Sequence, residues 1–229
     1  VKVPFSIKRN FGALALVVSA LSLCISLIVL LRGGPAGEAP QKFAQSPAIP
    51  VLDKAKESER EGRWEDAINT YKMVPSIEKG GLANEYLEAQ IRMATIQLRH
   101  LRQFEKARIV LEKLRARYSD PAIDAFLGEV YFHLGIYDDA QERIEAALAS
   151  QAGSVIALTP EFKREILFYH AYTLDRKNPP NAFNQALLME AVKAWNYYIE
   201  FSNCQGKTAD GECLFAKKRL SDLEKMDKK

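Results

Sequence analysis

The sequence has few of the residues on which catalytic and metal sites depend. It contains 3 histidines and 3 cysteines among 229 residues. It also has no glycine-rich phosphate loop, no G-x-S-x-G element and no H-E-x-x-H pair. These patterns are typical of nucleotide-binding proteins, α/β-hydrolases and zinc proteases. The sequence therefore gives no positive support for an enzyme, and we expect neither a cofactor nor a metal site.

Acidic residues are missing from the first 32 positions, which contain Lys2, Lys8, Arg9 and Arg32. Subtracting these 4 from the 32 basic residues of the chain leaves 28, against 29 acidic residues. Proteins that bind nucleic acid need a basic field to neutralise phosphates. Because the chain beyond residue 32 has no such excess, we expect no nucleic-acid partner.

Charged side chains are also missing from residues 11–31, FGALALVVSALSLCISLIVLL. A helix of this length spans about 31 Å, which matches the hydrocarbon core of a bilayer. The segment predicts one transmembrane helix, preceded by a cytoplasmic flank of residues 1–10. A cleavable signal peptide is the alternative, although its apolar region usually runs only about 7–15 residues.

The positive charges around this segment favour one orientation. Lys2, Lys8 and Arg9 precede the apolar run, whereas Arg32 alone follows it closely. By the positive-inside rule the N-terminus lies in the cytoplasm. The sequence thus predicts a single-pass protein of the bacterial cytoplasmic (inner) membrane whose C-terminal domain is periplasmic. Residues 32–50 are rich in Gly, Pro and Ala and are expected to form a linker.

After the linker, apolar residues recur with the i, i+3, i+4, i+7 spacing of helices, and one pattern repeats. Each repeat has an alanine with an aromatic residue three positions before it. The pairs are Trp64 and Ala67, Phe104 and Ala107, and Tyr137 and Ala140. The third repeat, LGEVYFHLGIYDDA over 127–140, also has the pattern L-G-x-x-Y.

These residues resemble the tetratricopeptide repeat (TPR) family, whose unit is a pair of antiparallel helices of about 34 residues. The resemblance covers roughly residues 51–202. It implies an all-α domain, an α-solenoid of three to four helical hairpins with a capping helix over 214–226, within residues 51–229. The fourth, degenerate unit would use helices over 165–174 and 187–201. The resemblance also implies that the following aromatic residues are core residues first: Trp64, Tyr71, Phe104, Tyr131, Tyr137 and Trp195.

Cys204 and Cys213 enclose eight residues, QGKTADGE. This is no common zinc spacing, and no histidine lies near it. If the domain lies outside the cytoplasm, we expect a disulfide. Closing a loop of about ten residues would stabilise the fold by roughly 2–3 kcal/mol in the chain-entropy model. Two free cytosolic thiols are the alternative.

The resemblance further implies a partner-binding surface on the first helices of the repeats. Its register gives nine candidate residues: Arg92, Ile96, Arg99, His100, Glu129, Phe132, His133, Phe168 and Tyr172. This mixture of cations and aromatic rings suits an extended peptide or an amphipathic helix. The alternative is that some of these residues only pack against the last helix.

Together these features favour a non-enzymatic, membrane-anchored protein–protein interaction scaffold. Its partners would be other proteins, such as subunits of a membrane or envelope complex, and the lipid bilayer through residues 11–31. No small-molecule substrate is expected. Two alternatives stay open: a periplasmic holdase-like chaperone for translocating or unfolded chains, and a cytosol-facing receptor with the opposite topology.

Overall fold

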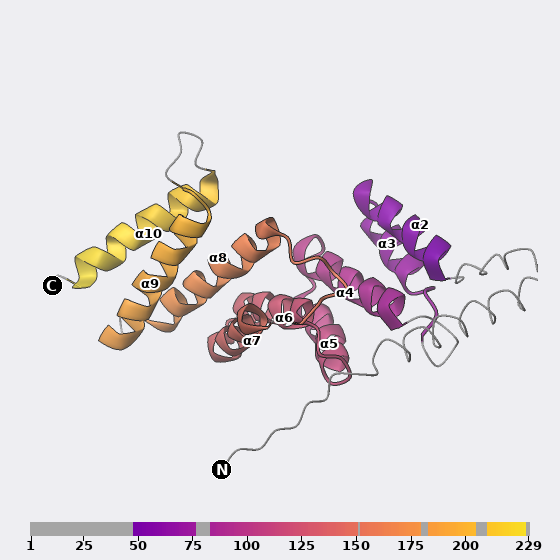
Figure 1. Ribbon diagram of the computed structural model, residues 1–229, viewed down its shortest axis with the longest axis horizontal. Coiled ribbons are helices and arrows are strands. Elements are labelled where there is room, and N and C mark those ends of the chain that lie inside the picture. Colours follow the sequence, from indigo (N-terminus) through magenta and orange to yellow (C-terminus); the bar gives the residue numbers. More distant parts are fainter. Residues whose placement is uncertain (1–47, 77–82, 151, 180–182, 205–209, 228–229) are drawn as a thin grey trace, which may run out of the picture. The chain divides into compact units, whose positions relative to one another are not determined.

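The computed structural model describes residues 48–76, 83–150, 152–179, 183–204 and 210–227. All regular structure in these ranges is helical, as predicted (Figure 1). The helices are α2 (Ala48–Arg60), α3 (Trp64–Tyr71), α4 (Ala83–Arg99), α5 (Phe104–Arg115), α6 (Pro121–Leu134), α7 (Tyr137–Ala149), α8 (Pro160–Lys177), α9 (Gln185–Phe201) and α10 (Gly211–Asp227).

The predicted membrane helix, its flank and most of the linker lie outside the described residues. Within the described ranges, no helix is both long and apolar enough to cross a membrane. Helix α2 begins at Ala48, which is earlier than the predicted end of the linker at Pro50. A proline is tolerated there because the N–H groups of a first helical turn have no partner within the helix.

Successive helices pair into hairpins, α2 with α3, α4 with α5, α6 with α7, and α8 with α9, and α10 packs on α9. The first helices of the hairpins, α2, α4, α6 and α8, also contact one another in order. They form a row that can be followed in Figure 1. The predicted fourth unit corresponds to α8 and α9, and the predicted capping helix to α10.

The turn within each of the first three hairpins contains a residue with left-handed backbone. These residues are Gly62 (φ 73°), Arg102 (φ 53°) and Gly135 (φ 77°). Glycine adopts this conformation without steric cost. A residue with a Cβ atom loses roughly 1–2 kcal/mol there. Arg102 is therefore the exception among three equivalent turns.

The aromatic residue after each of these turns contacts the last turn of the next first helix. The contacts are Trp64 stacked on His100 at 3.6 Å between ring centroids, Phe104 stacked on His133 at 4.8 Å, and Tyr137 beneath the guanidinium of Arg176 at 5.9 Å. An aromatic side chain at the same position thus joins consecutive hairpins three times, twice by ring stacking and once by a cation–π contact. Of the predicted core aromatics, Tyr71 and Trp195 are fully buried. The other four are half-buried.

Helices α6 and α7 cross closely at Gly128. A Cβ atom at this position would clash with Cγ1 of Ile144 and lie 3.2 Å from the carbonyl oxygen of Ala140. Ile144 is fully buried, so its side chain has little room to move. The glycine in the L-G-x-x-Y pattern therefore serves helix packing and not a turn.

The C-terminal helix is attached by a covalent bond and an ion pair. Cys204, after α9, forms a disulfide with Cys213 in the first turn of α10. Both sulfur-bearing residues are buried. Further along α10, Arg219 donates two hydrogen bonds of 2.9 and 2.6 Å to the buried carboxylate of Asp175 in α8.

We predict that Gly128→Ala lowers the free energy of unfolding by about 1–3 kcal/mol, because overpacking a core forces strained rearrangement. Denaturant unfolding followed by circular dichroism measures this change. Gly211→Ala is the matched control, since no atom lies within 4 Å of its added Cβ. Equal stability of Gly128→Ala and the parent chain would contradict the close crossing.

We predict that replacing Cys204 and Cys213 together by alanine costs roughly 2–3 kcal/mol, from the loop that the disulfide closes. Denaturant unfolding with and without reductant provides the measurement. The reduced parent should match the double variant, and reductant should leave the double variant unchanged. A parent chain whose stability survives confirmed reduction would count against this role.

Candidate partner-binding groove

A pocket of about 330 Å³ lies where α4, α5, α6, α8 and α10 approach one another. We call it the groove pocket. Its lining consists of Leu98, Arg99, Arg102, Phe104, Glu129, His133, Glu165, Phe168, Tyr169 and Glu212. The structure thus brings together four of the nine candidate residues: Arg99, Glu129, His133 and Phe168.

Arg99 forms the charged centre of the groove pocket. Its Nε lies 3.1 Å from both carboxylate oxygens of Glu129, and its Nη2 lies 2.7 Å from one of them. The same Nη2 is 2.8 Å from Glu165, and the guanidinium lies over the ring of Phe126. Burial alone would lower the pKa of Arg99, but the two glutamates raise it above its ordinary value. Arg99 is therefore a fixed cation shared by two helices.

Glu129 makes this arrangement difficult to change, because only 5% of its side chain is exposed. A buried carboxylate that loses its partner keeps the cost of desolvation without the compensating attraction. The pair of Arg99 and Glu129 consequently holds α4 against α6 and also sets the charge pattern in the pocket.

His133 contributes a neutral imidazole. Its ring is stacked on Phe104, and its Nε2 lies 3.3 Å from the hydroxyl oxygen of Tyr169. Burial lowers the pKa of His133, and the charges of Arg102 and Arg99 lower it further, against the opposite effect of Glu129. At neutral pH this side chain is therefore a hydrogen-bonding group and not a cation.

Six lining residues were not among the nine candidates: Leu98, Arg102, Phe104, Glu165, Tyr169 and Glu212. Arg102 is the one of these that the sequence could have indicated. It is exposed, and it makes no ion pair among the residues that the structure describes. The other two hairpin turns have glycine at the equivalent position. The sequence LRQF has arginine where the other two turns have glycine, and this difference was the signal that could have identified Arg102. It marks a turn in which a residue with a Cβ atom adopts the left-handed conformation despite the steric cost.

The predicted aromatic residues divide between the pocket and packing. Phe132 contacts the rings of His133 and Tyr172. Phe168 and Tyr172 both contact Trp195 of α9 and Phe215 of α10. The alternative of packing against the last helix therefore applies to both. Phe168 lines the groove pocket as well, whereas Tyr172 does not.

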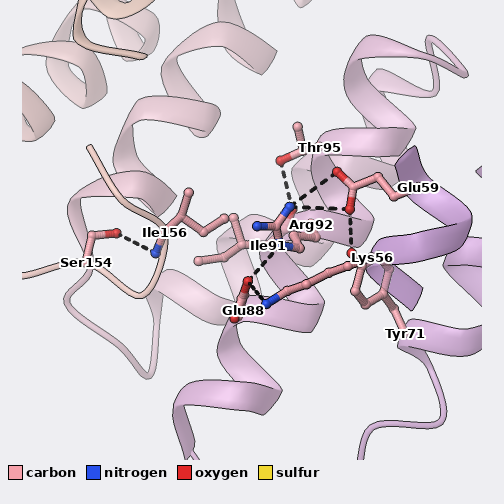
Figure 2. A network of polar contacts seen from close by, with 9 residues as sticks. All are labelled: Lys56, Glu59, Tyr71, Glu88, Ile91, Arg92, Thr95, Ser154 and Ile156. Atoms are coloured by element: carbon pink, nitrogen blue, oxygen red, sulfur yellow. Dashed lines mark hydrogen bonds and ion pairs between the residues drawn. The ribbon is translucent and has the colours of Figure 1, made fainter. Parts of the chain in front are cut away.

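Arg92 belongs to a different network, which Figure 2 shows between α2 and α4. Its Nε donates to Glu88 at 2.8 Å, and its Nη1 lies 3.4 Å from Glu59. Lys56 pairs with the same Glu88 at 2.8 Å, and the Tyr71 hydroxyl donates to Glu59. Arg92 is thus engaged in joining the first two hairpins.

Two further candidates are not part of the groove pocket. Ile96 is 1% exposed and lies in the core formed with α2 and α3, so it offers no surface to a partner. His100 is exposed but uses one ring face to stack on Trp64. Among the described residues, no group of three or more His, Cys, Asp or Glu could hold a metal ion.

Comparison with known proteins supports the fold alone. No protein-family model matches the sequence, and no curated protein matches it. Among solved structures, MamA (41-end) from Desulfovibrio magneticus RS-1 is similar, with a TM-score of 0.52 and 14% identity over 80% of this chain and 97% of that one. A tetratricopeptide repeat protein from Parabacteroides merdae gives a TM-score of 0.53 and 13% identity over 78% of this chain and 60% of that one.

These likenesses agree with the order of helical hairpins in the described residues. The described part of the chain therefore has a tetratricopeptide-like, all-helical fold.

Proposed function

We propose that the protein is a non-enzymatic interaction scaffold whose groove pocket holds a segment of a protein partner. Arg102 carries this proposal. It occupies a left-handed turn position where the two equivalent residues are glycines, and its charge lines the pocket without an ion-pair partner in the described ranges. Backbone strain that is kept at one site points to a functional constraint. The partner segment would place an acidic group on Arg102.

The rest of the pocket supports a defined partner more than a promiscuous holdase. Arg99 is already held by Glu129 and Glu165, so its charge pattern exists before binding. The rings of Phe104 and Phe168 add apolar lining. A pre-organised pocket with fixed charges selects a complementary segment, whereas promiscuous binders use flexible surfaces that can repack.

We also propose that residues 11–31 anchor this scaffold in the bacterial cytoplasmic membrane, with the helical domain in the periplasm. The uncharged run and the preceding basic residues support it. The disulfide between Cys204 and Cys213 is consistent with an oxidising compartment. In a cytosol-facing receptor these thiols would be kept reduced. The partners would then be subunits of a membrane or envelope complex.

We predict opposite effects of Arg102→Gly on stability and binding. Glycine relieves the left-handed backbone, so the free energy of unfolding should rise by about 1 kcal/mol. Loss of a charged hydrogen bond should weaken partner binding about tenfold or more. Denaturant unfolding measures the first effect, and quantitative co-purification from detergent-solubilised membranes measures the second.

Arg102→Lys is the matched control, because it keeps both the charge and the backbone cost. It should retain most of the binding and gain no stability. Undiminished binding by Arg102→Gly would remove the groove pocket from the proposal. Recovery of the parent chain alone, without a stoichiometric partner, would contradict the scaffold itself.

We predict that the full chain stays in the membrane fraction after an alkaline carbonate wash and that deletion of residues 11–31 releases it. A helix of that length in the hydrocarbon core resists extraction, unlike a peripheral contact. Labelling of unlysed cells with a membrane-permeant thiol reagent, followed by denaturation, tests the orientation: disulfide-bonded Cys204 and Cys213 should stay unlabelled, and labelled, reduced Cys204 and Cys213 would contradict the periplasmic assignment. Release of the full chain by carbonate would contradict the anchor.

A further inference from the structure

The connection between α7 and α8 lies against earlier hairpins. Ser154, Val155 and Ile156, which we call the strap, are half-buried although they belong to no helix. Val155 and Ile156 pack against the buried cluster of α4, α5 and α6 that includes Ile91 and Ile123. In the view of Figure 2, Ile156 is drawn next to Ile91 of α4. The strap thus covers apolar residues of the second and third hairpins.

Asp120 holds the polar side of the strap. Its Oδ1 accepts hydrogen bonds from the Ser154 hydroxyl at 2.6 Å and from the backbone N–H of Ala122, the second residue of α6, at 2.8 Å. Its Oδ2 accepts from the backbone N–H of Val155 at 2.9 Å. Asp120 is 5% exposed, so these bonds are largely protected from water. The carboxylate therefore caps α6 and binds the strap at once.

The strap is a bent segment that binds as a short turn-forming peptide would: the chain bends at Val155 and Ile156, and the Ile156 N–H donates to the Ser154 hydroxyl at 3.2 Å (Figure 2). A main-chain N–H and a hydroxyl meet a buried carboxylate, and two β-branched side chains enter an apolar surface. The residues on either side of the strap are exposed. These are Gly153 before it, and Ala157 and Leu158 after it, of which Leu158 is 39% exposed. The strap is consequently attached to the domain through a short stretch.

We infer that the surface beneath the strap, formed by Asp120 and the apolar cluster of α4 and α6, is a second docking surface. The partner that fits it is a segment that can adopt the same bend, with a hydroxyl-bearing residue followed by two β-branched aliphatic residues. The strap occupies the surface until such a segment displaces it. This inference rests on the proposed function, because it adds a second site on the same row of first helices.

Tethering determines how the site should behave. A tethered segment competes at a high effective concentration, in the millimolar range for short flexible links. A free peptide with the same contacts therefore binds poorly while the strap is in place. Weakening the strap without altering Asp120 or the cluster should expose the site.

The experiment uses the full chain in detergent and a fluorescent peptide with the sequence of residues 152–157, AGSVIA. The double variant Val155→Ser, Ile156→Ser should bind this peptide at least about tenfold more tightly than the parent, as read by fluorescence anisotropy. A peptide with serine in place of its valine and isoleucine should not bind. Leu158→Ser is the matched control and should bind like the parent.

Three results would overturn the inference. One is an opened variant with parental circular dichroism that binds no peptide, and another is a parent that binds equally well. The third is a concentration-dependent dimer of the parent, which would show that straps are exchanged between copies. Should the double variant not fold, Ser154→Ala carries the test, because it removes only the hydroxyl that donates to Asp120 and accepts from the Ile156 N–H, and leaves the bond from the Val155 N–H to Asp120. Its affinity should exceed that of the parent about threefold or more, and equal affinity would refute the proposal.

The outcome is independent of the groove pocket. Arg102→Gly should leave binding of the AGSVIA peptide unchanged. Failure of peptide binding, with partner capture by the parent retained, removes only the strap inference. Failure of the parent to capture a partner removes the proposed function.

Discussion

The contact between successive hairpins is the interaction on which the rest of the structure depends, because one pair of helices cannot bury its apolar face alone. Here that contact has a repeated form. An aromatic side chain after each of the first three turns meets the last turn of the next first helix. The residue that it meets is histidine twice and arginine once, so the stack leaves polar edges along the row of first helices.

The arginines along the row differ in how far contacts between hairpins already engage their guanidinium groups. Arg92 is engaged with α2, whereas Arg99 is engaged with α6 and α8. Both arginines lie on α4 and both act between hairpins. Their exposed edges can contact a partner, but their geometry is set by the domain. Arg102 differs because it lies beyond the end of α4, where no neighbouring acid of the described chain reaches it.

Much of the fold could be predicted from local patterns. The spacing of Trp64 and Ala67, and of the two equivalent pairs, marks the start of the second helix in each of the first three hairpins. Ile96 was a candidate for contact with a partner, but its side chain is buried, for a reason that lies in the tertiary structure. Its place on α4 is near that of Arg99, but α4 packs against both α2 and α6, and Ile96 is enclosed on the α2 side. Register alone does not tell which side of a helix a neighbour covers.

Contacts between distant parts of the chain explain what the sequence left open. Phe168 and Tyr172 are drawn into packing because α10 returns to the fourth hairpin, and that return depends on a disulfide and on Arg219, far along the chain. The strap could not be predicted from periodicity, because three residues outside any helix have none. The bonds to Asp120 span more than thirty positions. The sequence does not show that an aspartate that caps a helix also accepts hydrogen bonds from a distant loop.

The two candidate sites follow from the electrostatics of helix ends. Asp120 caps the N-terminus of α6, where the helix dipole favours negative charge, and Arg102 follows the C-terminus of α4, where it favours positive charge. Each charge is therefore stabilised by its helix before it contacts anything else. An antiparallel hairpin design places every first-helix N-terminus at one edge of the row and every C-terminus at the other. A carboxylate that accepts main-chain N–H groups then lies at one edge, and a cation that has no ion-pair partner in the described ranges lies at the other. In the two proposals, the same repeat architecture thus serves two kinds of recognition without a new element for either.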